Sequence, residues 1–193
     1  MKLTSFFGPF NFALVLVMLF AVVGAGCKQE PPKPGQEAFD SANARLTTFE
    51  SKVGFGNTAE AEQVASKFAQ EIVKREAEAF EGGKDAENSL TTQGKWLTYC
   101  QVNEGAVVLL VHVPHLDTYE GDERKALAEL VWETAAELSA PLRETKEKKV
   151  VVALRGNLLF GATAAGSAAG KPSITTGTAV ETDSLYPFFA SKS

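Results

Sequence analysis

The residues whose types could do chemistry gather near the middle of the chain. His112, His115 and Asp117 form a short cluster of metal-binding and acid–base residue types. Residues three apart in a strand point to opposite faces, so the spacing of the two histidines is poor for a shared metal ion or a proton-transfer site. Pro114 lies between them and could bend the chain until both rings meet. We expect structural histidines here, with a metal site as the alternative.

Cys100 is a second candidate, because a thiol next to a base can act as a nucleophile. Its apolar and aromatic neighbours predict a small buried residue in a strand, with a reactive thiol or an intermolecular disulfide as alternatives. In a hairpin with its turn at residues 103–105, Cys100 pairs with Val108, and His112 lies roughly 13 Å farther along the strand. A Cys100–His112 dyad is therefore not expected.

Other motifs of catalysis are incomplete. Gly161 and Gly166 have the spacing of a phosphate-binding loop, but Ser167 stands where that loop has Lys, and Ala168 where it has Ser or Thr. The acids of the predicted helices have the pattern of a solvated helix face: Glu60, Glu71, Glu76 and Glu78. No cofactor is implied by these residues.

The first 26 residues have the form of an export signal. Lys2 is followed by an apolar run, residues 10–23, that is interrupted only by Asn11 and is short for a membrane span. Gly24-Ala25-Gly26 then lead into Cys27. This junction resembles the lipobox of bacterial lipoproteins, with Gly24 where the family usually has Leu.

The resemblance implies that Cys27 carries fatty acyl chains and becomes the first residue of the mature protein. Ordinary secretion and an uncleaved membrane helix over residues 6–26 are the alternatives, and all three place the remainder outside the cytoplasm. Lys28 follows the cysteine where the enterobacterial retention signal for the inner membrane has Asp. We expect a lipoprotein of the cell envelope that faces the periplasm or the exterior, and lean toward the outer membrane.

Charge and composition limit the partners. Without residues 1–26 the chain keeps 18 basic and 24 acidic residues, a net charge of −6. Such a body is repelled by phosphate backbones, so nucleic acid is not an expected partner. Residues 27–36 contain Pro31, Pro32 and Pro34 and predict an extended tether between the anchor and the folded part.

Two helices are predicted before the central hairpin. Apolar residues three and four apart, from Phe39 to Val53, predict the first. Asn57 is a candidate N-cap for the second, whose apolar stripe runs from Ala61 to Ala79. Gly54-Phe55-Gly56 separates them as a break.

Alternating patterns then predict two hairpins with a helix between them. The first pairs residues 96–102 with residues 107–113, and the second pairs residues 150–154 with residues 158–163. A helix between Asp122, its candidate cap, and Leu138 separates the hairpins.

The order helix, hairpin, helix, hairpin predicts a two-layer α+β domain over residues 37–164. We expect a mixed sheet of about four strands, with residues 107–113 and 150–154 parallel and with the helices mainly on one face. Two separate hairpins that face each other around the helices are the alternative.

Residues 165–193 are rich in Gly, Ala, Ser and Thr and predict a flexible tail. The tail ends in an apolar segment that either docks onto the domain or binds an envelope protein: Leu185, Tyr186, Phe188 and Phe189. The whole pattern favours a lipid-anchored, non-catalytic binding module. A small extracytoplasmic enzyme, hydrolytic or metal-dependent, with a site near His112, His115 and Asp117 is the alternative.

Overall fold

The computed structural model describes residues 31–48, 51–80 and 95–190. The chain divides into two compact units, residues 1–32 and residues 33–193, and the elements described below belong to the second unit. Its helices are α2 (Gln36–Arg45), α3 (Ala59–Ala79) and α4 (Gly121–Leu138). Its strands are β1 (Gly54–Gly56), β2 (Leu97–Val102), β3 (Ala106–His112), β4 (Lys149–Arg155), β5 (Phe160–Ser167) and β6 (Ser173–Thr176). The described residues also form the short 3-10 helices η3 (Leu116–Thr118), η4 (Ala140–Leu142) and η5 (Asp183–Phe188).

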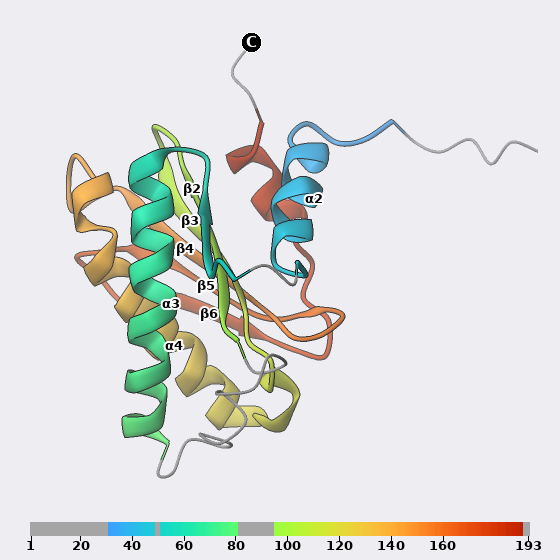
Figure 1. Cartoon of the computed structure of the whole chain (residues 1–193), viewed down its shortest axis with the longest axis vertical. Helices are drawn as coiled ribbons and strands as arrows, with labels where there is room; N and C mark the ends of the chain where they lie inside the picture. Colours follow the sequence, from blue (N-terminus) through green and yellow to red (C-terminus); the bar gives the residue numbers. More distant parts are fainter. Residues whose placement is uncertain (1–30, 49–50, 81–94, 191–193) are drawn as a thin grey trace, which may run out of the picture. The chain divides into compact units, whose positions relative to one another are not determined.

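All of these strands belong to one mixed sheet (Figure 1). The strands lie in the order β1-β2-β3-β4-β5-β6; the pairs β1–β2 and β3–β4 are parallel and the others are antiparallel. The predicted mixed sheet and the parallel pairing across α4 are confirmed. The expected number of about four strands is wrong, because the sheet has six. The alternative of two separate hairpins is also wrong.

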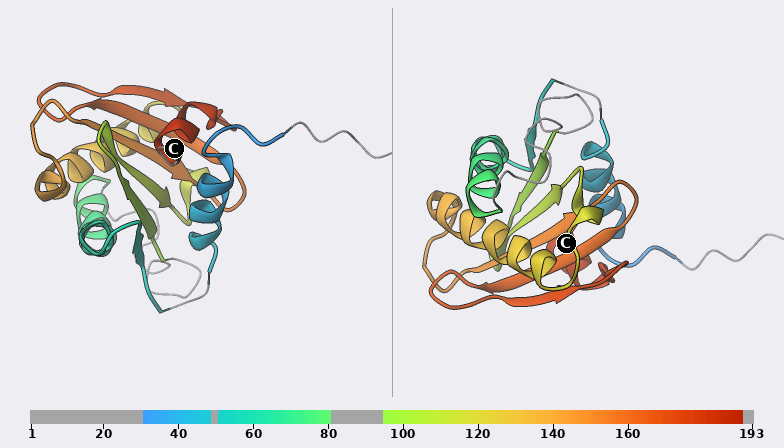
Figure 2. Two further views of the ribbon diagram at one scale, coloured as in Figure 1. Left: turned by 90° about the horizontal axis from the view of Figure 1, so that it is seen from above. Right: turned by 90° about the horizontal axis from the view of Figure 1, so that it is seen from below.

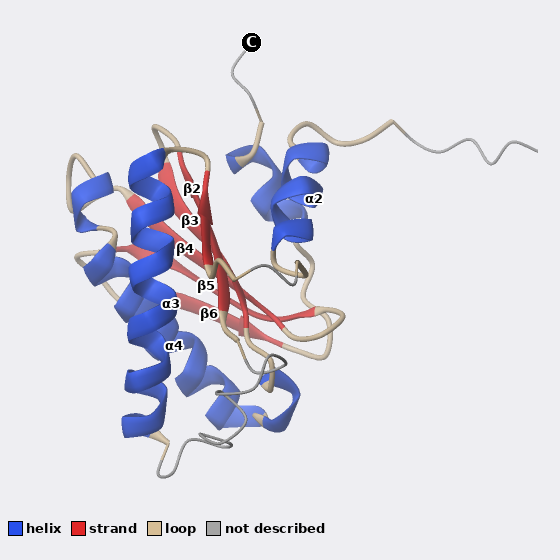
Figure 3. Cartoon of the chain, in the orientation of Figure 1, coloured by secondary structure: helices blue, strands red, loops and turns tan. Residues whose placement is uncertain are grey.

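The sheet is covered on both faces (Figures 2 and 3). The two long helices α3 and α4 pack on one face, as predicted, and contribute Phe68, Ile72 and Leu127 to its core. The opposite face, which the two-layer prediction left open, is covered by α2 and η5 through Phe39 and Leu185. The domain therefore has three layers, and β3 is buried on both faces of the sheet.

The break predicted at Gly54-Phe55-Gly56 is an edge strand, β1, and the predicted first helix ends early, at Arg45. A Cβ on Gly54 would lie 2.3 Å from the backbone nitrogen of Ser66, and one on Gly56 would lie 2.4 Å from that of Glu62. Only glycine lets α3 approach β1 this closely.

The cap of α3 lies one residue later than predicted. The Thr58 side chain accepts a hydrogen bond from the Ala61 nitrogen (3.1 Å). Asn57 instead pairs with the backbone of Val102, donating to its carbonyl (2.9 Å) and accepting from its nitrogen (3.0 Å). The predicted cap of α4 is also shifted, because Glu120 occupies the N-cap position and Asp122 lies in the first turn.

The register of the central hairpin differs from the prediction by one residue. Val102 pairs with Val107, Cys100 with Leu109, and Leu97 with His112. The Asn103 side chain stabilises this register, because its Oδ1 accepts from the nitrogens of Gly105 and Ala106 (both 2.9 Å), and the Asn103 nitrogen donates to the Ala106 carbonyl (3.1 Å), so that these two residues close the turn.

The region predicted as a flexible tail is instead part of the folded unit. β5 begins at Phe160, not at residue 158, and runs to Ser167. β6 then pairs with it, and Leu185 and Phe189 are buried against the α2 face. Gly35, with φ +85°, allows η5 to lie against the start of α2, since a Cβ there would lie 1.9 Å from the Tyr186 carbonyl oxygen.

Candidate functional site

A buried carboxylate lies beneath the segment that leaves the sheet after β3. Glu76 Oε1 lies 2.5 Å from His115 Nε2 and 2.6 Å from the Tyr119 hydroxyl. Because the same oxygen accepts from the tyrosine, the imidazole Nε2 must be the donor in its contact. Glu76 is 4% exposed and Tyr119 is fully buried.

The position of Glu76 corrects the prediction that it belongs to a solvated face. It follows Phe68 and Ile72 at spacings of eight and four, so the helix places it on the apolar stripe of α3. An acid at a stripe position is the sequence signal for this contact. Glu60 and Glu78 are exposed, as predicted.

Aromatic rings and one arginine hold the site together. The His115 ring lies between Trp96 (6.2 Å between centroids) and Tyr119 (5.8 Å). Arg124, in the first turn of α4, donates from Nε to the Tyr119 carbonyl (2.8 Å) and from Nη1 to the Gly177 carbonyl (2.9 Å). The carboxylate–histidine contact orients an imidazole in the way that catalytic and metal-binding histidines are oriented, and here it fastens α3 to the loop after β3.

The other two candidates of this cluster lie elsewhere. Val111 and Val113 face α3 and α4, so His112 between them points to the α2 face, while His115 bonds to α3. Asp117 is exposed beside Gly156, where a Cβ would lie 3.3 Å from its Oδ1. The two histidine rings therefore lie on opposite sides of the sheet, and Pro114 does not bring them together on one side.

Burial lowers the pKa of His112, and the nearby Arg155 guanidinium lowers it further. Weaker contributions from the backbone of Arg155 and Gly156 favour protonation without reversing the direction.

Cys100 is a fully buried strand residue on the side of α3 and α4. Burial raises the pKa of its thiol from 9.0 to about 12, so the thiol is protonated at neutral pH. His112 lies three positions from its pairing partner and on the other face of the sheet. The structure therefore does not bring Cys100 and His112 together as a dyad.

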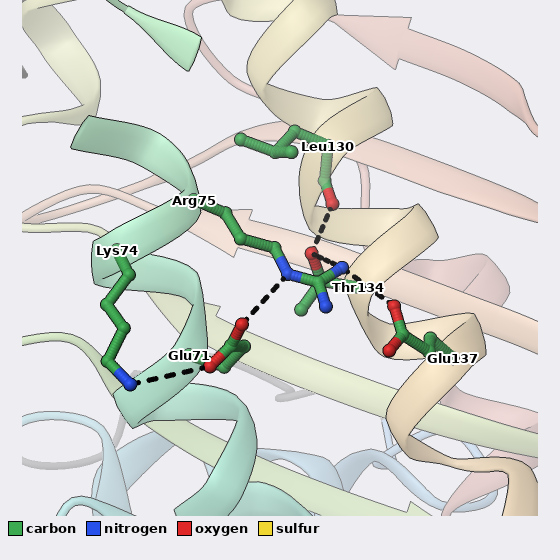
Figure 4. Close-up of polar contacts among 6 residues, drawn as sticks. All are labelled: Glu71, Lys74, Arg75, Leu130, Thr134 and Glu137. Carbon is green, nitrogen blue, oxygen red and sulfur yellow. Dashed lines mark hydrogen bonds and ion pairs between the residues drawn. The ribbon is translucent and has the colours of Figure 1, made fainter. Parts of the chain in front are cut away.

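Arg75, which precedes Glu76 in α3, links α3 to Glu137 of α4 (Figure 4). Its Nη1 lies 2.8 Å from Glu137 Oε2, and its Nε lies 3.3 Å from Glu71 Oε1. The hydrogen bond to Glu137 raises the pKa of Arg75, and the same contact lowers that of Glu137. Thr134, fully buried, donates to the Leu130 carbonyl (2.8 Å) behind the guanidinium. Both carboxylates are open to water, so this network aligns the helices more than it stabilises them.

Two findings concern only the described part of the chain. Within residues 31–48, 51–80 and 95–190, no three His, Cys, Asp or Glu side chains are grouped closely enough to hold a metal ion. None of the helices in those ranges has both the length and the apolar character needed to cross a bilayer. The predicted leader and Cys27 lie outside the described residues.

Comparisons with protein-family models, with curated proteins and with solved structures find no match to the chain.

Proposed function

We propose that the protein is a lipid-anchored component of the cell envelope whose folded unit binds a ligand and is not catalytic. The observation that carries this proposal is the junction Gly24-Ala25-Gly26-Cys27 after an apolar leader. Acyl chains carried by one cysteine hold a protein at a bilayer because each buried methylene contributes about 0.8 kcal/mol and more than one chain is attached.

The start of the folded unit is consistent with an anchor and a tether. That unit begins at Lys33, and α2 begins at Gln36, nine residues after Cys27. Nine residues reach at most about 30 Å, which limits how far an anchored domain could lie from the membrane surface.

The placement of the polar groups favours binding over catalysis. His112 and His115 serve different faces of the sheet, Asp117 is exposed, and burial keeps the Cys100 thiol protonated. A reaction centre needs such groups within hydrogen-bond reach of one substrate atom.

Mass spectrometry of the full chain isolated from its native host tests the anchor. We expect residues 1–26 to be absent and Cys27 to carry acyl chains. Cys27→Ala should abolish the acyl mass and release the protein from membranes or leave the leader uncut, whereas the control Cys100→Ala should be acylated like the wild type. A mature chain with an unmodified Cys27 would overturn the proposal.

A further inference from the structure

Two nitrogen-bearing side chains meet at the carboxyl ends of the parallel strands β3 and β4. His112 ends β3, Arg155 ends β4, and the two residues are paired in the register of the strands. Ala153 and the paired Phe160 belong to the α2-side core, so Arg155 points to the α2 face, as His112 does. Residues so paired have side chains about 5 Å apart.

Each of these side chains has a buried nitrogen that makes no hydrogen bond to any described residue. The atoms are His112 Nδ1 and Arg155 Nη1. Burial lowers the pKa of Arg155, and among the described residues no carboxylate opposes that effect. A guanidinium that is partly buried without an acceptor is costly, and native proteins satisfy such groups with a partner.

The charged groups near the pair are divided between the two faces of the sheet. Asp117 lies beside Gly156. A Cβ on Gly156 would point to the face of the sheet opposite that of Arg155, so Asp117 lies on that opposite face. Burial raises the pKa of the Tyr99 phenol. On the α2 face, Arg45 lies close enough to Tyr99 for its charge to lower that pKa, against the larger effect of burial. His115, whose charge also acts on His112, lies toward α3.

We propose that His112 and Arg155 form a binding site for the carboxylate group of a small ligand. A guanidinium presents parallel N–H groups that match the two oxygens of a carboxylate, and the imidazole adds a donor beside it. One arginine charge balances one carboxylate, whereas a phosphate at neutral pH carries nearly two negative charges. Leu97 and Phe160 flank the pair in the same row of the sheet, so the ligand has an apolar part next to its acid.

This site deepens the proposed function, since it names the class of ligand that the binding module takes. It rests on the proposed function only for its location in the envelope. In open α/β sheets, ligands bind outside the carboxyl ends of the parallel strands, and His112 and Arg155 occupy the corresponding ends of β3 and β4.

The test is a histidine titration of the full chain by NMR. The chain has two histidines, so ¹³C labelling of histidine gives two ring signals, which His115→Asn assigns. We expect sodium acetate to raise the pKa of His112 in a saturable way, with a dissociation constant on the order of millimolar for so small a probe. The His115 signal serves as an internal reference.

Substitutions identify the arginine. Arg155→Met should abolish the effect of acetate, while Arg155→Lys, which keeps the charge but loses the planar fork, should weaken binding about tenfold. The matched control is Arg143→Met, since Arg143 also has a buried nitrogen without a partner, Nε, but donates from Nη2 to the Ala136 carbonyl. The control should respond to acetate as the wild type does. Should Arg155→Met fail to fold, the Arg155→Lys titration decides.

Three outcomes would overturn the site. They are an unchanged His112 pKa in acetate, an equal change in sodium chloride, and an unaltered response in the Arg155 variants. Tighter binding of inorganic phosphate than of acetate would overturn the carboxylate assignment. Mass spectrometry of the same sample reports the state of Cys27 separately, so the anchor and the site fail independently.

Discussion

Replacing the buried Glu76 carboxylate should cost a large part of the stability of the domain. Glu76→Ala leaves the fully buried Tyr119 hydroxyl and the His115 Nε2–H without their acceptor. A hydrogen bond to a charged group is worth about 1.5 to 3 kcal/mol, and removal of one partner from a buried pair costs about 3 to 5 kcal/mol. Since single domains have about 5 to 15 kcal/mol in total, we expect a loss of about 4 kcal/mol.

Two further variants separate the contributions. Glu76→Gln keeps the volume and one acceptor oxygen but loses the charge, so it should cost about half as much as Glu76→Ala. Tyr119→Phe removes one donor and leaves the carboxylate with His115, at about 1 to 3 kcal/mol. The Glu76→Ala/Tyr119→Phe double variant should lose less than the sum of the two single losses, because both act on one contact.

Urea unfolding followed by tryptophan fluorescence measures these losses. Trp96, which is 2% exposed and meets the His115 ring edge to face, reports on this part of the core. Glu78→Ala is the matched control, because Glu78 lies on the same helix and is exposed. A Glu76→Ala midpoint equal to that of Glu78→Ala would refute the view that the buried contact fastens α3 to the loop after β3.

Three other properties follow from burial. Cys100 should react with iodoacetamide at pH 8 only after unfolding. Its raised pKa should make the stability of the domain fall more steeply between about pH 9 and 12 than that of Cys100→Ala, because the unfolded thiol ionises first. Because the pKa of His112 is lowered in the folded state, the free energy of unfolding should fall as the pH drops below 6.5. The urea midpoint of His112→Asn should fall less over the same pH range than that of the wild type. Phe189→Ala, which removes a ring that is 4% exposed, should lower the free energy of unfolding by about 3 to 5 kcal/mol in a thermal melt. Phe188→Ala should lower it by less, because Phe188 is less buried. Equal effects of the two phenylalanine variants would contradict the packing of η5.

Local periodicity was enough to predict the elements that form the middle of the fold. The stripe of α3 and the apolar runs of β3 and β4 appear in the sequence because these elements bury whole faces. The parallel pairing of β3 and β4 followed from the helix between them, which covers the distance that a crossover needs.

Elements defined by distant contacts could not be predicted in this way. β1 is a Gly-Phe-Gly segment that looks like a break, and it is a strand because it pairs with β2, about forty residues later in the chain, while its glycines let α3 pack against its backbone. β6 is a short strand of Ser, Ile and Thr whose pairing partner, β5, gives it its structure. Neither segment buries enough of its own side chains to produce a periodic pattern.

The candidate residues show the same division. The rings of His112 and His115 lie apart, but not through the strand alternation that the sequence argument used, because β3 ends at His112 and His115 lies in the following turn and bonds to α3. Arg155, which pairs with His112, lies some forty residues after it in the sequence, and Glu76, which bonds to His115, lies some forty residues before it. No local pattern connects residues so far apart in the sequence.

The exit of the chain from the sheet explains why two polar sites lie so close together in the sequence. His112 is the last residue of β3 and faces α2, whereas His115 lies beyond Pro114 and bonds to α3. A full layer of apolar β3 side chains separates the two faces, so the two histidines share no contact, and the charge of His115 is the smallest of the effects that act on the pKa of His112. We therefore expect Glu76→Gln to lower stability while the acetate response of His112 stays unchanged. A loss of that response in the folded Glu76→Gln protein would show that the two sites are coupled and would contradict their independence.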